Sequence, residues 1–154
     1  MKKFILAMAA LTFSFGVMSA QDLASATATY NSGAEALTMG NKTSALEYFQ
    51  KALTMAESLG EEGAEVVTNC KNAIPSVILS IGKEFYNNKD FSNAKAKFVE
   101  AAEVAKKYGN EEVSAEVESL LPTVGKRIAL AKVNEAMKNK DIAGVLAGYE
   151  EAMA

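Results

Sequence analysis

The sequence predicts an all-α protein built from about three similar helix hairpins. Beyond residue 22, apolar residues recur at helical spacing almost throughout, and one pattern returns after 49 and again after 51 residues. A strand would need alternation or an apolar run between turn signals, and only the short segment 77–79 offers one. With 154 residues, 49% of them hydrophobic, the chain can bury the core of one compact domain.

The first 20 residues have the order of a secretory signal peptide. Lys2 and Lys3 precede an apolar stretch over 4–17, and the small residues Ser19 and Ala20 precede the polar pair 21–22. The apolar stretch is too short to span a bilayer of about 30 Å. We therefore expect cleavage after Ala20 and a periplasmic or secreted protein of residues 21–154. The alternative is that this stretch forms a buried first helix of the folded domain.

The charge of the remaining chain argues against a nucleic-acid partner. Removing residues 1–20 takes away two of the 16 basic residues and none of the 19 acidic ones, which leaves a net charge of −5. Nucleic-acid binding depends on lysine and arginine that neutralise phosphates. We expect no nucleic acid as partner.

The repeated pattern is an apolar stripe on an amphipathic helix. Its first copy is Ala45, Phe49, Ala52, Leu53 and Ala56, and its second copy is Ala94, Phe98, Ala101, Ala102 and Ala105. Gly60 and Gly109 follow these helices, where a left-handed cap would end them. A third and weaker copy has Val145, Tyr149 and Ala152. We expect Phe49, Phe98 and Tyr149 to hold the cores of the three hairpins.

Two prolines lie inside the segments that lengthen the later repeats. Pro75 and Pro122 follow the segments 61–74 and 110–121, in which a polar face continues through Glu65, Lys71, Glu116 and Glu118. Either the first helix of each later hairpin is long and kinked at its proline, or a separate helix ends just before it. The continuing polar face favours the long helix.

These residues resemble the tetratricopeptide repeat family over roughly 26–154. The resemblance rests on Gly33 and Gly40 in the first copy. In the second copy it rests on a fuller signature, which is Gly82, Phe85, Phe91, Ala94, Phe98 and Ala101. In the third copy Val133 stands where the packing glycine is expected. It implies a right-handed α-solenoid of antiparallel hairpins, with repeats at about 26–60, 61–109 and 110–154. The repeat spacing exceeds the family's 34 residues. A plain helical bundle with the same pattern is the alternative.

The composition excludes most catalytic chemistry. Histidine is absent, and there is one cysteine, Cys70, so histidine triads, imidazole ligands and cysteine-rich zinc sites have no residues to form them. The acidic pairs at 61–62, 111–112 and 150–151 are sequence neighbours, which diverge on a helix. We expect no enzyme, cofactor or metal. Cys70 either is buried among apolar neighbours, which we favour, or forms an intermolecular disulfide.

The resemblance implies a non-catalytic protein-interaction scaffold whose concave groove binds a peptide or partner protein. In the family the first helix of each pair lines the groove. Carried onto this chain, those positions are Tyr30, Leu37, Thr38, Leu79, Lys83, Tyr86, Asn87, Arg127, Leu130, Asn134 and Lys138. The set holds three cations and no acid, which favours an acidic segment or a C-terminal carboxylate. The family's carboxylate clamp is not reproduced, since Tyr30 and Ala34 stand at its first-repeat positions. A carrier of glycan or lipid with a pocket between the helices is the alternative function.

The end of the last helix predicts self-association. Solenoids usually finish with a repeat whose outer face is polar, but this helix ends at Ala152–Ala154 soon after its apolar stripe begins. A second subunit would cover it, so we expect a homodimer formed through this end.

Overall fold

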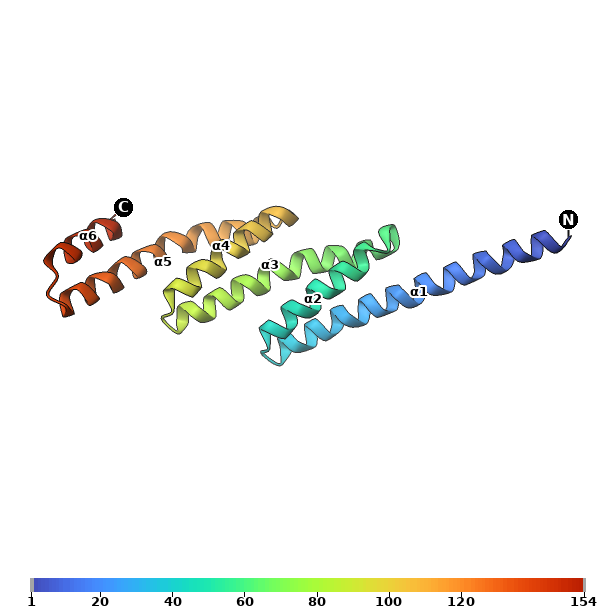
Figure 1. The fold of residues 1–154 in the computed structure, drawn as a ribbon, viewed down its shortest axis with the longest axis horizontal. Helices are drawn as coiled ribbons and strands as arrows, with labels where there is room; N and C mark the ends of the chain where they lie inside the picture. Colours follow the sequence, from blue (N-terminus) through green and yellow to red (C-terminus); the bar gives the residue numbers. More distant parts are fainter. Residues whose placement is uncertain (1, 154) are drawn as a thin grey trace. The chain divides into compact units, whose positions relative to one another are not determined.

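The structure is a computed structural model that describes residues 2–153, with their side chains from residue 20 onward. These residues are 90% helical and contain no strand, which confirms the all-α prediction. The helices pack in neighbouring pairs (Figure 1). They are α1 (Lys2–Thr38), α2 (Lys42–Glu57), the short 3-10 helix η1 (Gly60–Gly63), α3 (Ala64–Asn87), α4 (Phe91–Tyr108), α5 (Glu111–Lys138) and α6 (Ile142–Met153).

The expected leader, 1–20, falls at the start of α1, and its side chains before residue 20 lie outside the described residues. Within the described part of the chain, no helix combines the length and the apolar character needed to cross a membrane.

One turn design joins the two helices of every hairpin. The second residue after the first helix has a left-handed backbone, at Gly40 (φ 80°), Lys89 (φ 62°) and Lys140 (φ 56°). In each turn this residue donates its N–H to the carbonyl three residues back, and the next residue donates to the carbonyl five back, as from Asn41 to Ala36 at 2.8 Å. This pair of bonds is the Schellman ending of a helix.

The residue that follows the left-handed position starts the next helix. The side chains of Asn41, Asp90 and Asp141 accept hydrogen bonds of 3.0–3.2 Å from backbone N–H groups three residues later. These bonds satisfy N–H groups that the first turn of a helix leaves free. The three copies therefore share their turn chemistry as well as their apolar stripes.

Both prolines lie inside continuous helices. Pro75 is within α3 and Pro122 is within α5, so the long-helix alternative is confirmed and a break before each proline is excluded. The expected left-handed cap is present at Gly109 (φ 73°), which ends α4. The prediction that Gly60 caps the helix of the first copy is wrong. Helix α2 already ends at Glu57, and Gly60 (φ 60°) is the first residue of η1.

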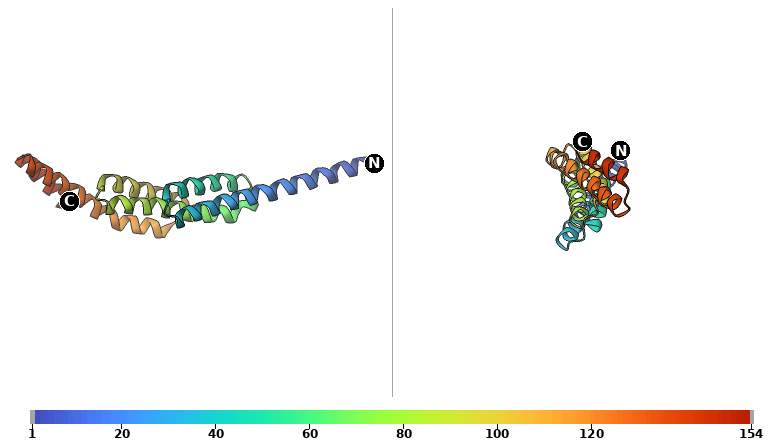
Figure 2. Two further views of the ribbon diagram at one scale, coloured as in Figure 1. Left: turned by 90° about the horizontal axis from the view of Figure 1, so that it is seen from below. Right: turned by 90° about the vertical axis from the view of Figure 1, so that its left-hand side faces the viewer.

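The chain divides into two compact units, residues 1–74 and 75–154. In the first unit α1 and α2 lie side by side (Figures 1 and 2). Gly33 of α1 lies against the ring of Phe49, where an added Cβ would fall 2.7 Å from Cε1. The ring of Tyr30 also meets Phe49, at 5.1 Å between centroids. Phe49 is buried as expected, and Cys70 is buried too, which confirms the favoured interpretation of that thiol.

In the second unit α4 lies against α3 and α5, and α5 against α6. Gly82 of α3 accommodates the ring of Phe98, which is 1% exposed as predicted. The prediction for Tyr149 is wrong, because its side chain is 45% exposed. The cause is Val133, whose isopropyl group fills the place that Gly33 and Gly82 leave open, and which packs against Gly148 instead.

Candidate partner-binding surface

The eleven predicted groove residues fall on the first helix of each hairpin, α1, α3 and α5. The predicted residues of α1 belong to the first unit, and those of α3 and α5 belong to the second unit. On α1, the ring of Tyr30 is used in packing on Phe49. The hydroxyl of Thr38 donates to the Ala34 carbonyl at 3.0 Å, and Leu37 is half-buried.

Two of the predicted α3 residues already interact with other residues of the fold. Leu79 is 3% exposed, because α3 is buried on several sides at 77–79, and it offers no surface to a partner. Lys83 forms an ion pair with Glu116 of α5, with 2.5 Å between Nζ and Oε1. Both side chains remain nearly half exposed, so water screens this pair and its contribution to stability is small.

The other two α3 residues meet a residue of α5 at a surface hollow of about 420 Å³. Tyr86, Asn87 and Arg127 line this hollow together with Lys89 and Phe91. Tyr86 and Asn87 come from the end of α3, Lys89 from the turn, Phe91 from the start of α4 and Arg127 from the middle of α5. We call these five residues the 86–127 hollow.

The 86–127 hollow combines an aromatic wall with positive charge. The rings of Tyr86 and Phe91 meet edge to face, at 5.4 Å between centroids and 64° between planes. Among the described residues neither Lys89 nor Arg127 forms an ion pair, and both side chains are exposed. A ligand that places a carboxylate beside an apolar group would meet matching chemistry here.

Sequence reasoning missed Lys89 and Phe91 as members of this site. Gly40 holds the position equivalent to Lys89 in the first hairpin, and Lys42 holds that of Phe91. A lysine in a position that demands a left-handed backbone carries strain, and such strain is often found at functional sites. The lysine in place of a turn glycine was therefore the available signal.

The remaining α5 residues, Leu130, Asn134 and Lys138, are exposed but do not line the hollow. The structure thus brings together three of the eleven predicted residues in one concave place.

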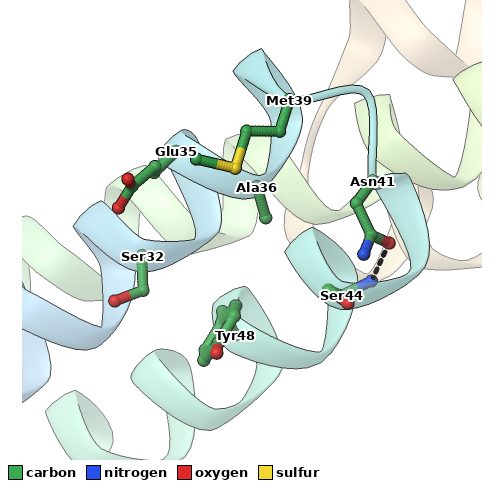
Figure 3. A pocket seen from close by; sticks show the side chains of 7 residues that line it. All are labelled: Ser32, Glu35, Ala36, Met39, Asn41, Ser44 and Tyr48. Carbon is green, nitrogen blue, oxygen red and sulfur yellow. Dashed lines mark hydrogen bonds between the residues drawn. The ribbon is translucent and has the colours of Figure 1, made fainter.

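A second type of hollow lies beside the hairpin turns. In the first hairpin it is lined by residues that include Glu35, Met39 and Tyr48, with Asn41 turned toward the backbone of Ser44 (Figure 3). The last hairpin has an equivalent hollow lined by the residues 100 positions later, among them Glu135, Asn139 and Gly148. Of the shared lining positions, only Glu35 and Ala36 keep their residue type, as Glu135 and Ala136. The repeated turn, and not a repeated set of side chains, therefore accounts for this hollow.

No cluster of three or more acidic or cysteine side chains suited to a metal ion occurs in the described part of the chain. Its buried side chains from residue 20 onward include no charged group.

Comparisons with family models, with curated proteins and with solved structures found no match to this chain.

Proposed function

We propose that this chain is a non-catalytic protein-interaction scaffold of the cell envelope that binds an acidic peptide segment. The observation that supports it is the 86–127 hollow, where Lys89 and Arg127 form no ion pair with another described residue and lie beside the ring pair of Tyr86 and Phe91. Stacked helix hairpins commonly present such surfaces to peptides. Residues 1–20 act as the export signal of this scaffold, and cleavage near Ala20 releases it.

The bound segment supplies a carboxylate and a neighbouring apolar side chain. The carboxylate, from a side chain or a chain terminus, accepts hydrogen bonds from Lys89 and Arg127, and the amide of Asn87 donates to a peptide oxygen. The apolar side chain packs on the exposed parts of Tyr86 and Phe91. Groups in this arrangement bind and orient a partner without breaking a bond.

Binding of labelled acidic peptides, followed by fluorescence anisotropy, tests the proposal. Each acidic peptide of the library ends in an apolar residue with a free C-terminal carboxylate. The same peptides with a C-terminal amide form the matched set. Arg127→Gln should weaken capture about three- to tenfold, because it removes one charge-assisted hydrogen bond from an exposed site. Lys126→Gln is the matched control, since Lys126 is an exposed neighbour on α5 outside the hollow.

A second pair of variants removes a cation without adding strain. Lys89→Gly should weaken binding while relieving the left-handed backbone, whereas Lys140→Gly makes the same change in the last hairpin and should leave binding unchanged. Reversal of Arg127 to glutamate should also lower the salt dependence of capture. Equal binding by all variants, or no preference for acidic peptides, would refute the assignment of the hollow.

A further inference from the structure

The free face of α6 carries the most continuous exposed apolar surface among the described side chains. Ile142, Leu146, Tyr149 and Met153 are 77%, 62%, 45% and 77% exposed, and they follow one another at i, i+4, i+7 and i+11. This spacing places all four on one side of a helix. Met137, in the last turn of α5, is half exposed as well. We call the four α6 residues the α6 stripe.

The earlier hairpins bury residues at two of the four stripe positions. The residues equivalent to Tyr149 are Phe49 and Phe98, both buried, and the residue equivalent to Met153 is Leu53, which is buried in the first hairpin. Helix α4 is packed against both α3 and α5, whereas α6 packs on α5 and exposes its stripe. The described residues therefore leave the α6 stripe uncovered.

The other described surfaces of the chain carry less exposed apolar area than the stripe. Head-to-tail stacking would place the α1 helix of a second chain on the stripe, but no large hydrophobic side chain is exposed on α1 from residue 20 to 38. Elsewhere in the described residues the large exposed hydrophobic side chains are scattered, namely Met39, Tyr48, Val99 and Leu130. A second α6 stripe is the surface that matches, since apolar groups then meet apolar groups along the whole helix.

We infer that two copies of the chain associate through their α6 helices, antiparallel about a two-fold axis. In this arrangement Leu146 and Tyr149 lie at the centre, and Ile142 of each copy meets Met153 of the other. The antiparallel order also brings opposite ends of the helix dipoles together. A two-fold contact closes the assembly at a dimer, whereas a head-to-tail contact would continue into chains.

The size of the surface sets the strength of the dimer. Side chains of this size bury on the order of 100–150 Å² each, so the four residues of the stripe offer roughly 500 Å² per copy. Two copies bury on the order of 1,000 Å², the low end of specific protein interfaces. The dimer should therefore be weak and depend on protein concentration.

Sedimentation equilibrium of the purified full chain, from about 1 µM to 1 mM, measures the association. We expect a monomer–dimer equilibrium in this range. Leu146→Glu should raise the dimer dissociation constant at least tenfold, because two like charges meet near the axis. Val99→Glu is the matched control, since it puts the same charge at an exposed apolar position of α4 and should leave association unchanged. Circular dichroism confirms that both variants keep their helices.

Cross-linking tests the geometry without adding charge. Leu146→Cys should give disulfide-linked dimers under mild oxidation, whereas Val99→Cys should remain monomeric; the buried Cys70 stays unreactive in the folded chain. A monomer at 1 mM, a dimer that ignores Leu146→Glu, or growth beyond the dimer would each overturn the inference. Failure here leaves peptide capture by the 86–127 hollow untouched, because α6 contributes no residue to that site.

Discussion

Gly148 lies directly against Val133, and this pair reverses the packing of the first two hairpins. An added Cβ at Gly148 would fall 2.5 Å from Cγ2 of Val133. In the earlier hairpins the glycine is on the first helix and the large side chain is on the second, as with Gly82 and Phe98. The last hairpin keeps close contact between its helices by exchanging which of them carries the small residue.

Gly148→Ala should destabilise the chain by about 1–2 kcal/mol. The added methyl group overpacks against Val133, and this cost exceeds the gain in helix propensity. In a Val133→Ala background the same substitution should cost less by at least about 0.5 kcal/mol, because the colliding methyl group is absent. Urea denaturation followed by circular dichroism measures both values.

Gly125→Ala provides the control of opposite sign. Nothing lies within 4 Å of an added Cβ at Gly125, so helix propensity alone acts there. The variant should be about 0.5–1 kcal/mol more stable than the parent chain. Equal effects at Gly148 and Gly125 would contradict the packing described for the last hairpin.

Phe98→Ala should destabilise the chain by about 3–5 kcal/mol, because the ring is fully buried between α3 and α4. Tyr149→Ala, at the equivalent position of the last hairpin, should cost about 1 kcal/mol or less in the monomer, since that ring is 45% exposed. The two unfolding free energies are compared at low protein concentration, where α6 pairing is absent. Similar losses in both variants would mean that the third hairpin packs like the second.

The apolar stripes made the hairpins predictable, and single residues decided where prediction failed. Phe49 and Phe98 follow the repeat because a glycine faces each of them. Tyr149 does not, because a valine on the partner helix excludes the ring, and this depends on a contact between helices that a stripe on one helix does not encode.

The same limit applies to the candidate site. Leu79 lies at a groove position by register, but α3 is enclosed by its neighbours there. Lys89 was overlooked because the equivalent residue, Gly40, has no side chain. Lys89 belongs to the site because the α3–α4 turn lies beside α5 in the folded chain. Sequence spacing alone does not specify this contact.

Lys140→Gly should stabilise the chain by about 0.5–1 kcal/mol. Lys140 has φ 56°, a left-handed backbone that costs a residue with a Cβ about 1–2 kcal/mol, and the greater freedom of glycine in the unfolded chain offsets part of the gain. Lys138→Gly, inside the last turn of α5, should instead be destabilising. Thermal unfolding of the two variants checks the signs, and a loss of stability in Lys140→Gly would contradict the turn geometry.

The Cys70 thiol should make stability depend on pH between about 9 and 11. The pKa of the Cys70 thiol is raised from 9.0 to about 11, mainly because the thiol is buried and also because the negative carboxylate of Glu57 is near it. Because the folded chain holds this proton more tightly, the contribution is fully present below pH 9 and is lost as the pH rises to 11. The loss is on the order of 2 kcal/mol for a shift of this size. Cys70→Ala serves as the reference, because it lacks the thiol and keeps every other ionisable group of the chain. The difference in unfolding free energy between parent and variant should shrink from pH 8 to pH 11, and a constant difference would show that the thiol ionises as readily in the folded chain as in the unfolded one.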